Sequence, residues 1–405
     1  MSAAEAPFDG IVCIGGEDWW YHNRGHFDFQ IMRRLAKRWP VLFVNSLGVR
    51  MPSLRHDRMF AQRIVRKLKS LSRGLVEAEP GFWVFSPMVA PGRAGQMLSA
   101  WALAPQIRLA ARRAGIRRPL LWMHCPAGAG LVAQIPHVAM VMQRTDRFEA
   151  FPEADPAEVG SQIASLKEQA DLVIYAAPHL EAEERGQVAK SLLVTHGVDL
   201  ERFLDAGMAR REPADMAGIT GPRVGFIGGI DRHTFDPELF LDVVARLPDH
   251  QFVMVGACSL PDGWCSAPNV HFLGRKPYDV VADYMAAMDA LIMPWNRSDW
   301  IKACNPIKLK EYLAVGRPVI TTDFPALDGW RDTVRVADDA ATFAMWIREA
   351  TSLGVGASGL SERLAAQTWD AKSAEIAAAL VDCCGSGDAR TADVAGHATM
   401  RRQVA

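Results

Sequence analysis

Short apolar runs alternate with longer amphipathic stretches along most of this 405-residue chain. Runs rich in Val, Ile and Leu are typical of strands that are buried on both faces of a parallel sheet. In the first half these runs are Ile11–Ile14, Val41–Asn45, Phe82–Phe85, Leu120–Met123, Val138–Met142, Leu172–Tyr175 and Leu192–Val194. In the second half they are Val224–Ile227, Phe252–Val255, Val270–Leu273, Ala290–Met293 and Val319–Thr322. Between the runs, apolar residues at a spacing of four, such as Phe27, Ile31 and Leu35, predict helices.

The alternation of strands and helices begins twice. Each beginning is a strand that ends in a Gly-Gly turn, at 15–16 and at 228–229. We therefore predict an α/β fold of two doubly wound, Rossmann-like domains with parallel sheets. The expected division is 1–204 for the first domain, 205–221 for a linker, 222–384 for the second domain and 385–405 for a disordered tail. Ligands of such folds bind at the carboxyl ends of the strands, so two facing domains are expected to form one central cleft.

The charge distribution limits the partners. A formal net charge of −1 argues against binding nucleic acid through bulk charge. The first 120 residues nevertheless carry 19 basic and 8 acidic side chains, and much of this excess lies in residues 49–76. There, apolar positions share one helical face among arginines and lysines, which is typical of a helix at an anionic membrane surface. A solvated helix or a disordered excursion is the alternative.

The cysteines and the first residues of the chain indicate in which cellular compartment the protein is expected. The seven cysteines form no pair of CxxC motifs, so we expect no zinc site and a reducing environment. The first ten residues do not resemble a signal peptide, and no apolar run approaches the length of a membrane span. We therefore expect a cytoplasmic protein that binds peripherally to the inner face of the cell membrane.

The strongest local pattern begins at Asn305, which is expected to cap a short helix with Pro306 at its first position and Gly316 at its C-terminal cap. The N-terminus of a helix attracts phosphate. Lys308, in the first turn, opposes the helix dipole, and a bound diphosphate would explain its presence there. Glu311 is placed to accept hydrogen bonds from sugar hydroxyls. A surface helix with a solvated Lys and Glu is the alternative.

A second pattern, residues 228–233, follows the first strand of the second half. Gly229 lets the backbone approach a ligand closely, and Arg232 can hold a phosphate through two hydrogen bonds. GxGxxG is absent after both starting strands, so a dinucleotide site is not predicted. A tight turn with a surface Arg is the alternative.

In the first half, the loop after the first strand carries the side chains of Asp18, Trp19, Arg24 and His26. This mixture of aromatic and polar groups suits a carbohydrate or another amphipathic ligand. The alternative is a loop that packs its tryptophans into the edge of the domain.

Two further residues follow strands of the first half, His124 and Asp146. Each occupies a strand end that is expected to face the cleft, so either could act as a general base. The alternative for both is an ordinary loop residue, and Asp146 could also be ion-paired with Arg144 or Arg147, which lie beside it.

These patterns together resemble the GT-B glycosyltransferases. Residues 305–320 resemble the signature P-x-K-x-x-E-Y-L-A-x-G-x-P-V-I, closest to the retaining, family-4-like enzymes of bacterial polysaccharide synthesis. Residues 196–203 are similar to the N-G-V-D-x-x-R-F junction of that family, with His196 in place of Asn. Residues 23–36 resemble a teichuronic-acid-type subgroup, and residues 272–278 match F-L-G-x-x-P-Y.

This resemblance implies a glycosyltransferase whose second domain binds a UDP- or GDP-linked sugar and whose first domain binds a saccharide or lipid-linked acceptor. The donor-binding residues would be Gly229, Arg232, Arg275, Asn305, Lys308 and Glu311. Arg232 and Lys308 would hold the diphosphate and Glu311 the ribose. No cofactor and no metal ion are expected, because these cations and a helix N-terminus can stabilise the leaving group.

One departure from the family leaves the chemistry open. Ala303 stands where the family has a Glu that grips the transferred sugar, so neither the donor sugar nor the stereochemistry follows from the resemblance. An inverting enzyme would use Asp146, our first choice, to deprotonate the acceptor, whereas a retaining enzyme would use it to orient the acceptor. A nucleotide-sugar epimerase of the same fold and a catalytically silent nucleotide-sugar-binding protein are the alternative functions.

Overall fold

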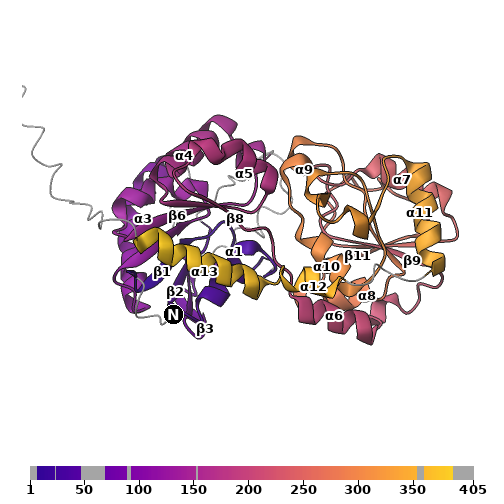
Figure 1. Ribbon diagram of the computed structural model, residues 1–405, viewed down its shortest axis with the longest axis horizontal. Helices are drawn as coiled ribbons and strands as arrows, with labels where there is room; N and C mark the ends of the chain where they lie inside the picture. Colours follow the sequence, from indigo (N-terminus) through magenta and orange to yellow (C-terminus); the bar gives the residue numbers. More distant parts are fainter. Residues whose placement is uncertain are drawn as a thin grey trace, which may run out of the picture. The chain divides into compact units, whose positions relative to one another are not determined.

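The computed structural model of the protein describes residues 7–22, 24–46, 69–88, 93–151, 154–353 and 360–385 (Figure 1). The chain divides into two compact units. The first unit consists of Met1–Tyr175, Glu184–Leu192 and Ser373–Ala405, and the second of Ala176–Glu183 and Leu193–Lys372. The chain therefore passes between the units more than once, and the predicted linker, 205–221, lies inside the second unit.

The first unit is built on an eight-stranded sheet in the order β3-β4-β2-β1-β5-β6-β7-β8. The strands are β1 (Gly10–Ile14), β2 (Val41–Val44), β3 (Leu75–Glu79), β4 (Phe82–Phe85), β5 (Pro119–Met123), β6 (Ala139–Arg144), β7 (Leu172–Tyr175) and β8 (Ser191–Leu193). The pairs from β4 to β7 are parallel, as predicted. The edge strand β3 was not predicted and runs antiparallel to β4.

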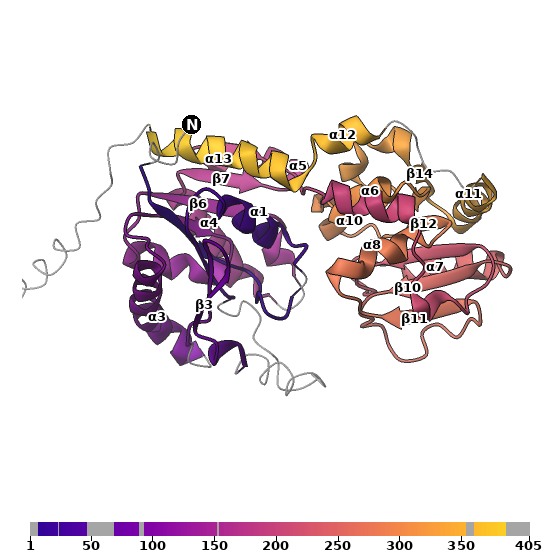
Figure 2. The ribbon, with the colours of Figure 1, turned by 90° about the horizontal axis from the view of Figure 1, so that it is seen from below.

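Helices cover the first sheet (Figures 1 and 2). They are α1 (Phe27–Leu35), α3 (Arg93–Arg113), α4 (Pro156–Gln169) and α13 (Trp369–Gly385), with short 3-10 turns η2 (Pro126–Gln134), η3 (Phe148–Ala150) and η4 (Arg185–Gln187). The short helix α5 (Pro178–Glu184) follows β7 in the chain. The predicted helical positions of α1 are buried, Ile31 completely. α5 begins within the segment that clusters with the second unit, and α13 returns to the first unit from Ser373 onward.

The second unit contains a six-stranded sheet in the order β11-β10-β9-β12-β13-β14, parallel throughout. Its strands are β9 (Arg223–Ile227), β10 (Gln251–Val255), β11 (Val270–Gly274), β12 (Ala290–Met293), β13 (Val319–Thr321) and β14 (Arg335–Val336). Five of the six were predicted to within a residue or so at each end. The two-residue strand β14 was not.

Helices lie on both faces of this second sheet. They are α6 (Leu200–Ala209), α7 (Pro237–Arg246), α8 (Tyr278–Ala286), α9 (Asp299–Ala303), α10 (Ile307–Val315), α11 (Ala340–Leu353) and α12 (Ser361–Ala365), with 3-10 turns η5 (Ala214–Met216), η6 (Pro325–Leu327) and η7 (Arg331–Thr333). Phe203 of α6 and Leu309 of α10 share one apolar cluster with Leu291 of β12. Phe240 of α7 and Phe343 of α11 belong to the cluster on the opposite face. Burial of both faces explains why these strands read as continuous apolar runs.

Candidate functional site

Helix α10 begins at the carboxyl end of the second sheet, one residue away from the predicted start. Pro306 is the cap residue, with φ −74° and ψ 125°, and Ile307 is the first helical residue. The predicted cap, Asn305, instead donates its amide Nδ2 to the Ala176 carbonyl at 3.0 Å. The helix starts one residue later than predicted because the Asn305 side chain donates to a backbone carbonyl and does not accept a hydrogen bond from the N-terminus of α10. At the other end, Gly316 adopts the predicted left-handed cap, with φ 75°.

Lys308 brings an amine over the Gly-Gly turn that follows β9. The Lys308 amine lies where a Cβ at Gly228 would be, and the φ of 152° at Gly228 is one that residues other than glycine rarely adopt. The Nζ atom lies 4.7 Å from the centre of the Phe226 ring and 5.4 Å from that of Trp295. Burial among these groups lowers the pKa of Lys308 to about 8. The amine is therefore a cation at neutral pH, held where few anionic groups stabilise it.

Glu311 lies on the same side of α10, three residues further along. Its side chain is buried, and Oε1 accepts a hydrogen bond from the Tyr278 hydroxyl at 3.1 Å. Burial raises the pKa of Glu311 to about 7. The neighbouring Tyr312 hydroxyl accepts from the backbone N–H of Ile227 at 2.8 Å, which fixes α10 to the end of β9. The structure therefore brings together Lys308, Glu311 and the Gly-Gly turn, as the sequence suggested.

The turn after β9 presents Arg232 at the surface. Asp231 organises the turn, since its Oδ1 accepts from the backbone N–H groups of His233 and Thr234 at 3.0 Å each. Gly229 and Arg232 are exposed. Arg275, after β11, is exposed too. Within the described ranges, neither guanidinium contacts an acidic side chain, so both are available to an anionic ligand.

Lys310, which the sequence analysis did not single out, points to a different side of α10. Only 3% exposed, its amine donates to Gln367 Oε1 at 2.8 Å, Thr195 Oγ1 at 3.0 Å and the His196 carbonyl. Burial lowers the pKa of Lys310 to about 7. These partners lie in the segments on either side of the bridge between Val198 and Thr368.

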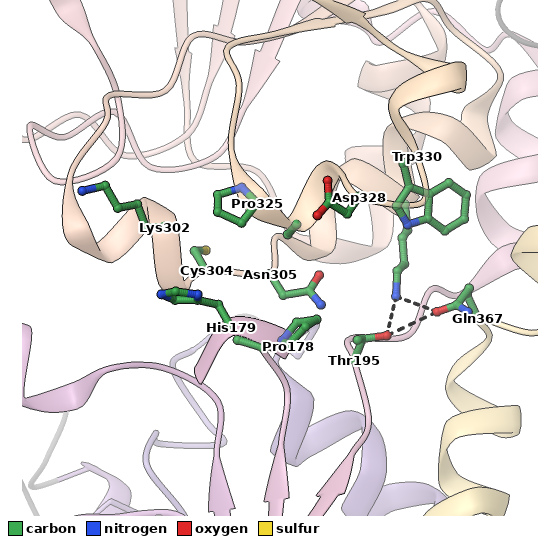
Figure 3. Close-up of a pocket in the computed structure, with 13 residues that line it drawn as sticks. Pro178, His179, Thr195, Lys302, Cys304, Asn305, Pro325, Asp328, Trp330 and Gln367 are labelled. Atoms are coloured by element: carbon green, nitrogen blue, oxygen red, sulfur yellow. Dashed lines mark hydrogen bonds between the residues drawn. The ribbon is translucent and has the colours of Figure 1, made fainter. Parts of the chain in front are cut away.

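A cavity of about 440 Å³ opens beside Lys310 (Figure 3). Its lining residues all lie in the second unit, and they include Lys302, Cys304, Asn305 and Trp330. Lys308 and Glu311 are not among its lining residues. Of the predicted donor residues, only Asn305 lines this cavity. The start of α10 therefore borders two separate surfaces, this cavity and the Gly-Gly turn beside Lys308.

In the first unit, His124 follows β5 and is held on several sides. Its Nδ1 lies 3.1 Å from Asp28 Oδ2 and 3.2 Å from the backbone nitrogen of Gly16, and its Nε2 lies 3.3 Å from Thr145 Oγ1. A Cβ at Gly16 would lie 2.9 Å from the ring, so a larger residue there would have to displace His124. Burial lowers the pKa of His124, the hydrogen bond and charge of Asp28 raise it, and the net result is a raised pKa. Asp28, fully buried on α1, was missed because it lies in an apolar helix face.

Asp146, after β6, is half-buried and close to His124. Burial raises the pKa of its carboxyl group, and the charge of His124 acts in the opposite direction. The neighbouring Arg144 does not use this carboxylate. Its guanidinium bonds to Glu149 at 2.8 Å and Glu184 at 2.9 Å, and to the backbone carbonyl of Asp146 at 2.9 Å. The alternative of an Asp146–Arg144 ion pair is therefore wrong.

The predicted acceptor loop contains one residue that cannot take that role. The Trp19 side chain is 2% exposed and packs against Phe29 and Phe82 at ring distances of 5.2 and 4.9 Å, so it has no free face for a ligand. Arg24 is exposed and lies 4.7 Å above the same ring. His26 is exposed just before α1, and Asp18 accepts from Trp20 N at 2.9 Å. Trp19 is part of the core because Phe29 of α1 and Phe82 of β4 enclose its ring.

Some expectations lie outside the described residues. Residues 47–68, which hold most of the predicted membrane segment 49–76, are among them, and so is the predicted tail from 386 onward. The side chain of Ala303 is also outside the description. Within the described helices, none is long and apolar enough to cross a bilayer.

Comparison with known proteins finds similarity to one family over part of the second unit. Residues 221–352 match the family model of the glycosyl transferases group 1. The Bacillus subtilis protein TuaH, which carries the name of a teichuronic acid biosynthesis glycosyltransferase, is 33% identical over 139 residues, or 33% of this chain. The match spans about a third, 34%, of the length of that relative.

Solved structures match over nearly the whole chain. Sucrose-phosphate synthase from Thermosynechococcus elongatus has a TM-score of 0.66 at 17% identity, covering 93% of this chain and 99% of that one. Anabaena HepE, solved with UDP and glucose, has a TM-score of 0.58 at 13% identity, covering 91% and 98%. A UDP-forming α,α-trehalose-phosphate synthase from Burkholderia vietnamiensis has a TM-score of 0.61 at 12% identity, covering 94% and 100%. At sequence identities of 12–17%, these matches show a similarity of fold alone.

Proposed function

We propose that this chain, whose residues 221–352 match the group 1 glycosyl transferases and whose fold is that of GT-B structures, transfers a sugar from a nucleotide-sugar donor to a saccharide or lipid-linked acceptor. One observation carries the proposal. The half-buried Lys308 side chain places its amine above the Gly-Gly turn, and Glu311 lies three residues further along α10. A bound diphosphate would supply the negative charge that the amine lacks, and the carboxylate would accept hydrogen bonds from ribose hydroxyls.

The proposed donor chemistry depends on positive charge. A nucleoside diphosphate leaves with developing negative charge, which must be stabilised in the transition state. We propose that Lys308, Arg232 and the N-terminus of α10 provide this stabilisation without a metal ion. The adjacent acids Asp338 and Asp339 are engaged elsewhere, since Asp338 pairs with Arg297 at 2.8 Å and Asp339 accepts from backbone N–H groups at the start of α11.

The proposed donor is UDP- or GDP-linked, with Arg275 meeting the base. HepE binds UDP and glucose, which supports a uridine nucleotide as the first choice to test. In the first unit, His124 and Asp146 are the proposed catalytic residues that act on the acceptor, and Asp18, Arg24 and His26 are proposed to bind it. The TuaH likeness supports an acceptor in cell-wall or surface polysaccharide synthesis.

A lipid-linked acceptor would require contact with a membrane. We propose that the basic segment 49–76 provides it at the inner face of the cell membrane. The described surface of α3 supports this partner, because residues 101–118 contain five arginines and no acid, with Trp101 76% and Leu109 52% exposed. Tryptophan and arginine favour the boundary between lipid headgroups and water.

Two experiments test these proposals. Purified protein incubated with UDP- and GDP-sugars plus acceptor should give acceptor-dependent transfer, whereas an isomerised donor would indicate an epimerase and an unchanged donor a silent binding protein. Anionic liposomes should bind the protein at low salt and release it as salt rises, since each basic residue near such a surface contributes about 1 kcal/mol. Replacing the four residues Arg63, Arg66, Lys67 and Lys69 with Gln should abolish this binding but not nucleotide binding. No binding to liposomes at low salt would indicate a soluble acceptor.

A further inference from the structure

The carboxylate of Glu311 is held by a tyrosine from a different helix. Tyr278 is the first residue of α8 and follows Pro277, which has φ −59° and ψ 146° and ends the loop after β11. The Tyr278 hydroxyl donates to Glu311 Oε1 at 3.1 Å. Among the side chains that the structure describes, no other donates a hydrogen bond to this carboxylate. One carboxylate oxygen is therefore bonded to the protein, and Oε2 is left to a ligand.

The ring of Tyr278 is fixed by its packing, where α6, α8 and α10 lie side by side (Figures 1 and 2). It lies against the apolar cluster that includes Phe203 of α6 and Leu309 of α10. The guanidinium carbon of Arg202 lies 5.2 Å from the centre of the ring, and the centre of the Phe203 ring lies 6.3 Å away. These contacts involve the ring and not the hydroxyl. A phenylalanine at this position would keep them and lose the hydrogen bond to Glu311.

The ionisation of Glu311 depends on the groups that surround it. Burial is the largest effect and raises the pKa of Glu311, which the other groups leave at about 7. The hydrogen bond from Tyr278 lowers this pKa, because it stabilises the ionised carboxylate, and the positive charge of Lys308 lowers it too. Of the charged groups near α6, Asp199 raises the pKa and Arg202 lowers it. Without the Tyr278 hydroxyl, the carboxylate would therefore take up its proton at a higher pH.

We infer that Tyr278 is a positioning residue of the donor site, whose hydroxyl holds Glu311 ionised and turned so that Oε2 accepts a hydrogen bond from a ribose hydroxyl of the nucleotide. This inference rests on the proposed donor site. A ribose hydroxyl bonds more strongly to a carboxylate than to a neutral carboxyl group. A carboxylate that is fixed before the ligand arrives also loses less side-chain freedom on binding. Tyr278 thus acts on the nucleotide through Glu311.

The pair is tested first without nucleotide, by ¹³C NMR of the full chain labelled at Cζ of its five tyrosines. The Tyr278 signal, identified as the one missing from Tyr278→Phe, should shift with a midpoint at about pH 7 as Glu311 ionises. This shift should disappear in Glu311→Gln. If no tyrosine signal loses such a shift in Glu311→Gln, the inference is overturned. That comparison uses the wild type and Glu311→Gln, so it does not require Tyr278→Phe to fold.

Calorimetry with UDP provides the second measurement. Loss of a hydrogen bond to a charged group should raise the pKa of Glu311 by about one unit. At pH 7, the Kd of Tyr278→Phe for UDP should then be about fivefold higher than that of the wild type, and this ratio should fall as the pH rises to about 9. Lys308 loses its proton over the same range in both proteins, so its effect cancels in the ratio.

Tyr284→Phe is the matched control. Tyr284 lies on the same helix, and its hydroxyl also donates to a carboxylate, Asp215 Oδ1 at 2.7 Å, which is not part of the proposed donor site. This variant should bind UDP as the wild type does at each pH. In the Glu311→Gln background, Tyr278→Phe should change the Kd for UDP no further, because the hydroxyl acts through the carboxylate.

The outcomes separate the inference from the function on which it rests. If the wild type binds UDP and Tyr278→Phe has the same Kd at pH 7, the inference is refuted and the donor site stands. An equal loss from Tyr278→Phe in the Glu311→Gln background would refute it in the same way, since the tyrosine would then act independently of Glu311. If neither UDP nor GDP binds to the wild type, the proposed function is refuted, and the inference with it.

Discussion

Replacing Lys308 with Met should stabilise the ligand-free protein and weaken its binding of nucleotide. The pKa of Lys308 is about 8, against an ordinary value of 10.5. At about 1.4 kcal/mol per pKa unit, keeping the buried amine charged costs about 3 kcal/mol at most. Below pH 8 the folded and unfolded chains both hold this proton, so the whole cost is present at neutral pH. It is recovered as pH rises from about 8 toward 10.5, because only the unfolded chain then keeps the proton.

Met preserves the packing of the side-chain stem and removes the charge. Thermal unfolding of Lys308→Met at pH 7 should therefore show a midpoint several degrees higher, since 1 kcal/mol corresponds to about 2–4 °C for a domain of this size. Adding UDP at about 100 times its Kd should stabilise the wild type by about 2.7 kcal/mol. The variant should lose most of this shift, because a charged contact with phosphate contributes on the order of 2–4 kcal/mol.

Lys302→Met is the matched control. Lys302 is the fourth residue of α9, is 57% exposed and pairs with Asp299 at 2.8 Å. Its replacement should change neither the unfolding temperature nor the nucleotide shift. Lower stability in Lys308→Met together with a full UDP shift would contradict both the buried-cation argument and the donor site.

Three further changes probe other groups. Glu311→Gln should weaken donor binding in calorimetry and remove its dependence on pH near 7, because the wild-type carboxylate ionises and accepts hydrogen bonds better above that pH; unchanged affinity at pH 6 and 8 would refute the role. Asp146→Asn should lower turnover more than it changes donor Kd, since a group that acts on the acceptor matters in the transition state; normal turnover would reduce Asp146 to a loop residue. Lys310→Ala should lower the free energy of unfolding, measured by urea denaturation, by about 1–3 kcal/mol, because its buried acceptors lose their donor. An unchanged free energy of unfolding would show that water replaces the amine.

Most of the fold could be predicted because its strands are buried on both faces. Runs such as 224–227 and 290–293 are apolar throughout, and their sheet is covered by helices on each side. The missed strand β3 has a different pattern. It is an edge strand that includes Glu77 and Glu79, and only one neighbour pairs with it. Its register is set by contact with β4, which no local pattern encodes.

The candidate site was predictable where its residues are close in sequence. Lys308 and Glu311 share a helix face, so their spacing alone indicated that they act together. Asp28 and His124 are 96 positions apart, and their contact depends on how α1 packs beside β5. Lys310 and Thr195 are 115 positions apart, and their contact likewise depends on tertiary packing that the local sequence does not show. For Trp19 the prediction of a ligand-binding role was wrong, because an aromatic residue in a loop can pack into the core as readily as it can bind a ligand.

The division of the chain has a consequence for how the protein is made. The second unit is complete once Lys372 has been synthesised, whereas the first unit still lacks the part of α13 that begins at Ser373. That helix supplies Ile376 and Leu380, both fully buried. The unit that starts first on the ribosome is therefore the one that finishes last. A stop codon before Ser373 would leave an intact second unit attached to a first unit with an uncovered apolar surface, which invites aggregation.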